Sequence, residues 1–249
     1  LSDQVPPSLS REELVKEIII EELTTISTKY GDARKTEIVE KEGEIEVEDL
    51  IIQEDMVVTV SHNGYIKRNP ISLYRSQRRG GKGVTGMTTR QEDFVEHLFV
   101  ASTHSHILFF TSSGKVFWQK VYELPQAGRA AMGKAIVNLL NLSPDEGLAA
   151  ILAVREFVEG KYIVMATRKG LIKKTALMEY SRPRAGGIIA LSIDADDELI
   201  AARVTDGSQD ILLGSREGKA IRFKETEVRP MGRTARGVRG MTVGKDDVI

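Results

Sequence analysis

The loop from Gln77 to Gly83 has the residue types that could bind a phosphate group. It places three positive charges within five residues and combines them with three glycines. Glycines let a backbone N–H come close to a phosphate, arginines donate to two phosphate oxygens at once, and a lysine acts as a point charge. The loop therefore predicts a contact with a polyanion. Its residues are Gln77, Arg78, Arg79, Gly80, Gly81, Lys82 and Gly83.

A nucleotide-binding P-loop does not fit this spacing. That motif needs a lysine followed by serine or threonine at the start of a helix. Here Lys82 is followed by Gly83 and Val84, and no helical pattern comes after them. We therefore interpret the loop as a contact with a nucleic-acid backbone.

The loop belongs to the first of four similar sequence units. From residue 56 onward, short β-rich runs alternate with glycine-centred turns, and an Asn-Gly pair is a strong hairpin signal. The turn glycines, separated by 50, 56 and 48 residues, are Gly64, Gly114, Gly170 and Gly218. A second glycine follows each at offsets of 19, 19, 16 and 19 residues, at Gly83, Gly133, Gly186 and Gly237. This concordance predicts a repeat architecture.

We expect each unit to form one four-stranded blade of an all-β, propeller-like array. The blades would span about 56–105, 106–160, 161–209 and 210–249, with the last incomplete. Residues 1–36 should hold an α-helix that precedes the array, because Ser10 and Glu13 form a capping box. The acidic stretch 37–55 is expected to be a linker, in which one short strand is possible.

Basic residues recur at corresponding positions of the units and would form a belt around the rim of the array. In the loops they are Arg129, Lys134, Arg182, Arg184, Arg229, Arg233, Arg236 and Arg239. On the strands after the turn glycines they are Lys67, Arg68, Lys173, Lys174, Arg222 and Lys224. A belt of phosphate contacts without residues that read bases is typical of sequence-tolerant wrapping of duplex DNA.

The overall charge of −1 hides a strong asymmetry. Residues 1–55 contain 6 Lys/Arg and 16 Asp/Glu, whereas residues 56–249 contain 29 Lys/Arg and 20 Asp/Glu. The basic part is large enough to attract a polyanion. The chain has no cysteine and no apolar run of the ~20 residues that cross a bilayer. A cytoplasmic location without a membrane partner is expected.

Other constellations predict little chemistry. His104 and His106 could share a strand face as zinc ligands do, but no third ligand is near in sequence. The acids at 194, 196 and 197 are interpreted as an acidic turn rather than a magnesium site. Since no Ser/His/Asp grouping or pair of carboxylates stands out, we expect no catalytic residue, metal site or cofactor in this chain.

The loop from Gln77 to Gly83 closely resembles the signature box of the C-terminal domain of the DNA gyrase A subunit. The segments 31–38, 48–55 and 236–240 also resemble parts of that subunit, so the likeness extends over about residues 11–249. It implies a β-pinwheel, a propeller-like ring that has six blades in the family, of which about four are visible here. The family's catalytic tyrosine region is absent from this chain.

The resemblance also implies a function. Double-stranded DNA would wrap around the rim so that a gyrase-type topoisomerase can introduce negative supercoils, with the seven loop residues as the box needed for wrapping. The partners would be the gyrase B subunit together with a second A subunit in an A2B2 holoenzyme, where ATP and magnesium act outside this chain.

Two alternatives remain at this point. The A-type subunit of topoisomerase IV resembles gyrase but has a degenerate box and fewer blades. A propeller-type protein-interaction scaffold would explain the repeats, although it would not explain the basic loop.

Overall fold

The computed structural model describes residues 11–32, 35–36, 47–74, 79–81, 83, 85–89, 92–143 and 146–249. The chain forms two compact units, Leu1–Ile45 and Glu46–Ile249. In the first unit, helix α1 (Arg11–Tyr30) has acidic residues in its first turn and Lys29 in its last, as the helix dipole favours. This confirms the expected helix, although Ser10 of the predicted cap lies outside the described residues. No described helix is long and apolar enough to cross a membrane.

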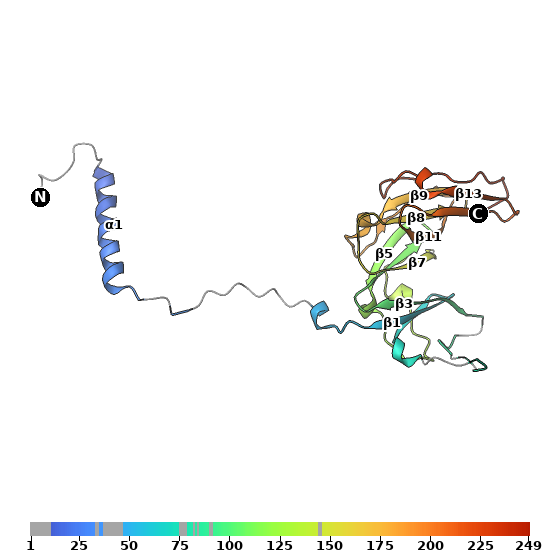
Figure 1. Ribbon diagram of the computed structural model, residues 1–249, viewed down its shortest axis with the longest axis horizontal. Helices are drawn as coiled ribbons and strands as arrows, with labels where there is room; N and C mark the ends of the chain where they lie inside the picture. The colour runs from blue at the N-terminus through green and yellow to red at the C-terminus, as the bar shows by residue number, and fades with distance from the viewer. Residues whose placement is uncertain are drawn as a thin grey trace, which may run out of the picture. The chain divides into compact units, whose positions relative to one another are not determined.

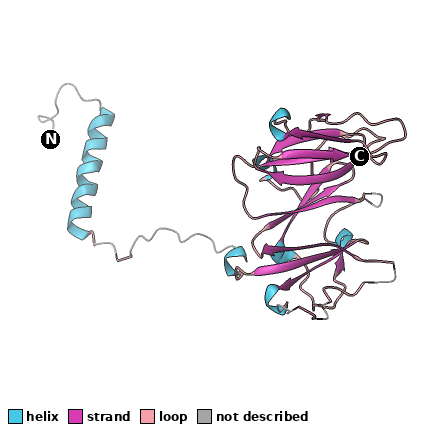
Figure 2. Ribbon diagram, turned by 45° about the vertical axis from the view of Figure 1, so that its right-hand side comes forward, coloured by secondary structure: helices cyan, strands magenta, loops and turns pink. Residues whose placement is uncertain are grey.

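The second unit is built from three four-stranded antiparallel sheets and one two-stranded sheet, which follow one another along the chain (Figures 1 and 2). The first two sheets use strands β1 (Asp55–Ser61), β2 (Tyr65–Pro70), β3 (Val95–Ser102), β4 (His106–Thr111), β5 (Lys115–Lys120), β6 (Lys134–Ala135), β7 (Leu148–Val154) and β10 (Ile188–Ile189). The others use β8 (Tyr162–Thr167), β9 (Leu171–Ala176), β11 (Leu199–Thr205), β12 (Asp210–Gly214), β13 (Ala220–Lys224) and β14 (Val238–Arg239). The all-β, propeller-like prediction is confirmed.

A short 3-10 helix follows the second strand of each β-hairpin, and two others occur elsewhere in the described chain. They are η1 (Val47–Leu50), η2 (Ile71–Leu73), η3 (Val121–Glu123), η4 (Ile136–Asn138), η5 (Leu177–Tyr180) and η6 (Glu225–Glu227).

Each complete sheet takes its last strand from the following repeat. The strand orders are β3-β1-β2-β6, β10-β5-β4-β7 and β11-β8-β9-β14. The chain leaves one sheet after its second strand, adds a short strand to the sheet before, and then returns. The expectation that each sequence unit forms its own four-stranded blade is therefore wrong. A two-residue strand such as β6 carries too weak a β pattern for its partner to be read from sequence.

The central strands supply side chains to two cores at once. In β4, Ile107 and Phe109 pack with the first sheet, whereas Leu108 and Phe110 pack with the third. Successive side chains of a strand point to opposite faces, so a strand between two neighbouring sheets must be apolar on both. This explains the continuous apolar runs of the sequence, and each fully buried large side chain contributes about 1.5–3 kcal/mol to folding.

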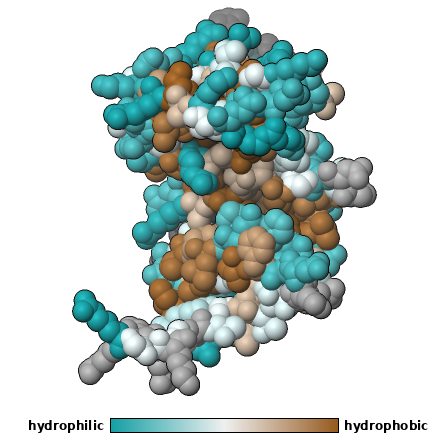
Figure 3. All heavy atoms as spheres, turned by 90° about the vertical axis from the view of Figure 1, so that its right-hand side faces the viewer, coloured by the Kyte–Doolittle hydropathy of each residue, from teal (hydrophilic) through white to brown (hydrophobic). Residues whose placement is uncertain are grey.

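Large apolar side chains are also exposed on the first and last sheets. On the side of the molecule drawn in Figure 3, hydrophobic residues reach the surface in several patches. Leu98 and Val100 of β3 and Leu212 of β12 are more than half exposed. They belong to the two ends of the array, where no further described sheet covers them.

The hairpin turns share a hydrogen-bonding device. Before each turn glycine, a Ser or Thr hydroxyl accepts a bond from the backbone N–H four residues later; in the first turn, Tyr65 N donates to Ser61 Oγ at 3.2 Å. A carboxylate from further along the repeat accepts from the same turn, as when Asn63 N donates to Asp93 Oδ1 at 3.0 Å. Asp197 and Asp247 serve the third and fourth turns in the same way.

The last residues of the predicted acidic linker pack on the sheets. Glu48, in η1, forms an ion pair of 2.7 Å with Lys120, and Thr103 Oγ donates to Ile52 O at 2.9 Å. Residues 47–54 are therefore part of the second unit, which corrects the expected linker boundary at residue 55. Residues 37–46 lie outside the described part of the chain.

Some of the glycines with positive φ lie where the chain passes close to the preceding sheet. Gly237 has φ +93°, and a Cβ added there would lie 2.7 Å from Ile172 O. In the third repeat this role belongs to Gly187, with φ +70°, and not to the expected Gly186. The sequence spacing does not identify the correct glycine, because the Gly-Gly pair offers two candidates. Packing against the preceding sheet selects Gly187.

We predict that Gly237→Ala destabilises the second unit by about 1–3 kcal/mol, because L-residues are strained at this φ and the carbonyl of Ile172 leaves no room. Gly232→Ala in the same segment is the matched control, since nothing lies within 4 Å of its added Cβ. Urea unfolding followed by the fluorescence of Trp118, the only tryptophan, measures both. Equal losses for the two variants would contradict this account.

Candidate nucleic-acid interface

The short fourth strands lie on the outer edge of the array. The second and third sheets each have one edge formed by a short strand, β10 or β14, and the other edge formed by β7 or β11. Strands β7 and β11 pack against each other, so the two sheets converge at that other edge. Strands β6, β10 and β14 therefore face outward. The segments that lead into them are residues 125–135, 181–189 and 228–239, and residues 75–90 stand at the corresponding place in the sequence of the first repeat. We call these four ranges the crossover segments.

Charge is strongly partitioned between the crossover segments and the rest of the array. The four segments contain 13 Lys/Arg and no Asp or Glu. All 20 acidic residues of positions 56–249 lie outside them. The described cations of these segments therefore concentrate positive charge at the outer edge, a distribution typical of proteins that bind polyanions.

Most predicted contact residues of the crossover segments are exposed. In the second and third segments they are Arg129, Lys134, Arg182 and Arg184. In the fourth they are Arg229, Arg236 and Arg239, with Arg233 half-buried. Of these, only Arg233 and Arg236 have a carboxylate partner among the described residues: Glu179 for Arg233, at 3.9 Å, and Asp194 for Arg236.

The predicted box is only partly described. Gln77, Arg78 and Lys82 lie outside the described residues, whereas Arg79, Gly80, Gly81 and Gly83 are exposed. The segment that follows the box approaches the second crossover segment, because Thr88 N donates to Ala130 O at 2.9 Å. The neighbour of that acceptor is Arg129, so Thr88 of the first crossover segment lies beside the second.

Lys67 and Arg68 of β2 do not belong to the exposed rim. Lys67 is fully buried, and its ammonium donates to the carbonyls of Gly128, at 3.1 Å, and Arg129. Burial lowers the pKa of Lys67. Arg68 donates from Nε to Leu124 O at 2.9 Å and from Nη2 to Tyr122 O at 3.0 Å. The expectation that these two residues face DNA is wrong, because their charged groups are used to hold the next repeat.

Lys173 and Lys174 of β9 repeat this arrangement. Lys173 is fully buried and donates to Ala190 O, at 2.7 Å, and to Arg233 O. Lys174 donates to Glu225 O at 2.8 Å, with its ammonium 5.1 Å from the centre of the Tyr162 ring. Both are structural lysines, which corrects the prediction that they lie on the rim. In the second repeat, Trp118 Nε1 plays the same part by donating to Tyr180 O at 2.9 Å.

The two predicted contacts on β13 are exposed. Arg222 pairs with Asp210 on the neighbouring strand at 2.7 Å, and its side chain is 71% exposed. Lys224 is exposed as well, at the start of η6. They differ from Arg68 and Lys174 because no crossover segment packs over β13 within the described chain.

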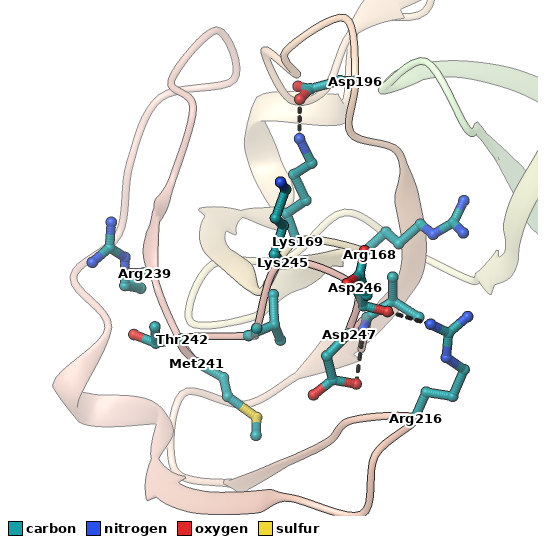
Figure 4. Close-up of a pocket in the computed structure, with 13 residues that line it drawn as sticks. Arg168, Lys169, Asp196, Arg216, Arg239, Met241, Thr242, Lys245, Asp246 and Asp247 are labelled. Atoms are coloured by element: carbon teal, nitrogen blue, oxygen red, sulfur yellow. Dashed lines mark hydrogen bonds and ion pairs between the residues drawn. The ribbon is translucent and has the colours of Figure 1, made fainter.

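A cavity of about 650 Å³ lies at the turn side of the third and fourth repeats (Figure 4). Its cations are largely used internally: Lys169 pairs with Asp196, and Arg216 donates to Asp246 O. The bond from Lys169 lowers the pKa of Asp196. Figure 4 shows Arg239 on the other side of the cavity from Arg216. The cavity therefore lies between two repeats and is lined by polar groups that mostly bond to one another, with Arg239 at its margin.

Sequence reasoning missed the carboxylates that lock the turns. Asp93 and Asp197 each precede the last strand of their unit by two residues, and Asp247 stands at the corresponding place in the fourth. That recurrence is visible in the sequence, but grouping the acids at 194–197 as one turn hides it. Among the described residues, no three His, Asp or Glu side chains are placed to hold a metal ion.

These features define a class of protein. The sheets converge on one side, and each complete sheet takes its outer strand from the next repeat. This arrangement is a propeller-like domain of the pinwheel type, here with a cationic outer edge. The profile of the family described as DNA gyrase C-terminal domain, beta-propeller, matches residues 55–102, 105–155, 161–206 and 209–249. The chain belongs to this family.

Individual relatives agree with this assignment. The DNA gyrase A subunit of Salmonella typhimurium is 52% identical over 233 residues, which cover 94% of this chain and 26% of that protein. The chain therefore spans about a quarter of the length of this relative. The crystal structure of the C-terminal domain of DNA topoisomerase IV matches with a TM-score of 0.69 and 28% identity, over 80% of this chain and 60% of that one. A DNA gyrase A C-terminal domain structure matches in fold, with a TM-score of 0.62 and 23% identity over 78% of this chain and 63% of that one.

The buried lysines make stability depend on pH. Burial, together with the positive charge of Arg233, lowers the pKa of Lys173 to about 8. An unfolded lysine keeps its proton until about pH 10.4. Between these values unfolding takes up a proton, so the free energy of unfolding rises with pH through this group.

We predict that the parent gains stability relative to Lys173→Met between pH 8 and pH 10, by an amount on the order of 2–3 kcal/mol. Urea unfolding at several pH values measures the difference. Lys219→Met, at an exposed position, should show no such trend relative to the parent. A constant difference between parent and Lys173→Met across this range would refute the prediction.

Proposed function

We propose that this chain binds duplex DNA along its outer edge and wraps it over successive crossover segments. The observation that carries the proposal is the complete exclusion of acidic residues from the four crossover segments, which contain 13 basic and no acidic residues. Strand exchange gives each complete sheet the same kind of outer edge. A protein-interaction scaffold would not need its cations gathered along that edge.

The exposed cations suit phosphate contacts rather than recognition of bases. They are arginines and lysines on glycine-containing segments, and arginine can donate to two phosphate oxygens at once. Bending a few tens of base pairs costs on the order of 1–6 kcal/mol, which several phosphate contacts on a curved edge can offset. The repeat provides such contacts at regular intervals, so binding should be tolerant of sequence.

The family supports an inference about the physiological setting. We infer that the chain acts within a gyrase-type topoisomerase, where the wrap directs strand passage toward negative supercoils. The expected partners are the gyrase B subunit together with a second A subunit in an A2B2 holoenzyme in the bacterial cytoplasm, with ATP and magnesium acting outside this chain. The intact box from Gln77 to Gly83 favours this setting over topoisomerase IV.

The structural match to a topoisomerase IV domain supports one alternative, in which the edge binds DNA without trapping a turn of defined handedness. Ligation of nicked DNA circles in the presence of the protein separates the two. A shift of the product toward one sign of supercoiling supports wrapping, and an unshifted distribution with intact binding supports the alternative.

The proposal predicts the salt dependence of duplex binding. Replacing Arg129, Arg182 and Arg229 together by alanine should weaken binding and reduce the slope of log K against log salt by about 0.9 for each lost phosphate contact. The box variant with Arg78, Arg79 and Lys82 replaced by alanine should do the same and also reduce bending. Fluorescence anisotropy and end-to-end energy transfer on a labelled 40-base-pair duplex measure these effects, a length of roughly the span expected for a short bent site.

The matched control removes three exposed cations outside the crossover segments, at Arg155, Lys161 and Lys219. This variant has the same net charge as the first, so an equal loss of affinity would show that charge alone matters and not its position. If the parent does not bind duplex DNA at 50 mM salt, the scaffold interpretation replaces the proposal.

A further inference from the structure

The fourth crossover segment, residues 228–239, differs from the second and third in facing carboxylates of the preceding repeat. It holds four arginines, more cations than either of those two segments. Arg236 Nη2 pairs with Asp194 Oδ2, and Arg233 Nε lies 3.9 Å from Glu179 Oε2. Half of its positive charges therefore already have a partner within the protein.

Glu179 is diverted from the role of its equivalents. Glu123 and Glu227 stand nine residues after their turn glycines, as Glu179 does, and both accept a backbone N–H at the start of their own 3-10 helix. In η5, whose residues are all described, no such bond is present. The carboxylate of Glu179 instead faces Arg233. The third repeat therefore lacks the bond that caps the 3-10 helix in the other two repeats, and has a contact with the fourth repeat in its place.

The backbone holds these partners opposite one another. Ser192 Oγ donates to Thr234 O at 2.7 Å, and Ser192 N donates to Ala235 O at 3.3 Å. Lys173, buried beneath, donates to Arg233 O. The segment on each side of the paired arginines is thus tied to the third repeat, and the ion pairs join two fixed stretches of backbone rather than two mobile ones.

The second and third crossover segments lack such competitors. Arg129 and Lys134 in the second, and Arg182 and Arg184 in the third, are exposed and have no carboxylate partner among the described residues. Under the proposed function these four cations are ready for phosphate, whereas Arg233 and Arg236 must first leave an internal partner.

We propose that Asp194 and Glu179 compete with DNA phosphates for the arginines of the fourth crossover segment. This inference rests on the proposed function and deepens it. The two carboxylates lower the affinity of this arginine-rich segment, so DNA engages the second and third segments first and the fourth last. The wrap then closes in order along the chain, with the fourth segment as its last contact.

Asp194→Asn tests the inference directly. Freeing Arg236 should tighten duplex binding by about two- to fivefold, the range that corresponds to an exposed ion pair, and should steepen the salt slope by about 0.9. Glu179→Gln should have a smaller effect in the same direction, because the Arg233 pair is longer. Anisotropy with a 40-base-pair duplex measures the affinities, a length chosen on the order of the bent sites described above.

A double-mutant cycle identifies the arginine concerned. In the Arg236→Ala background, Asp194→Asn should no longer tighten binding, because no freed arginine remains. Asp206→Asn is the charge-matched control: Asp206 is bonded to Ser208 and Gln209, which hold its pKa at about 2, and it touches no arginine of a crossover segment in the described structure.

The outcomes separate this inference from the proposed function. If Asp206→Asn tightens binding as much as Asp194→Asn, or if the gain persists in the Arg236→Ala background, the competition is refuted while DNA binding stands. If the parent does not bind duplex DNA at all, the proposed function fails and the inference fails with it.

Discussion

The structure depends on the burial of side-chain cations beneath the chain of the next repeat. Burying an ammonium group without hydrogen-bond acceptors would destabilise the fold by more free energy than a single surface contact contributes. Lys67 finds its acceptors in the carbonyls of residues 128 and 129, and Lys173 finds one of its acceptors at residue 233. These bonds can form only if the following crossover segment lies against the strand. Strand exchange, packing and the charge of β2 and β9 are therefore parts of one constraint.

This constraint places the exposed charge. The second and fourth crossover segments accept these bonds through backbone carbonyls, so their cationic side chains are not used to hold the buried lysines. In the second segment, Arg129 provides a carbonyl to Lys67 and keeps its own guanidinium exposed. A single residue thus joins the interior to the outer edge. Repeating this arrangement from sheet to sheet produces a line of cations whose spacing is set by the cores between the sheets.

Acidic residues serve the opposite side of the fold. The carboxylates of Asp93, Asp197 and Asp247 accept backbone bonds at the hairpin turns, away from the crossover segments. Glu146 does related work in the second repeat, where bonds from Ser113 and Thr111 outweigh burial and lower its pKa. Acids thus stabilise the turns and leave the outer edge positive. Asp194 and Glu179 instead face the arginine-rich fourth crossover segment.

Local pattern alone was sufficient for the repeat, the hairpin turns and the basic crossover segments. A turn glycine and alternating apolar residues act over a few positions, and they leave a mark that recurs in each unit. Local pattern does not distinguish Gly186 from Gly187, because only Gly187 packs closely against Phe117 of another sheet. Strand exchange was equally invisible, since two-residue strands such as β6 and β14 have no pattern of their own.

The fate of each cation was decided only by the tertiary structure. Lys67 and Lys134 are both lysines of the same basic belt in the sequence, yet one is fully buried and the other is exposed. The difference is whether a crossover segment covers the strand and offers carbonyl oxygens to the ammonium group. That depends on contacts between residues about 60 positions apart, as between Lys67 and Gly128. Residue types determined that the protein would carry its charge on repeated basic segments, and long-range packing decided which of those charges remain free for a ligand.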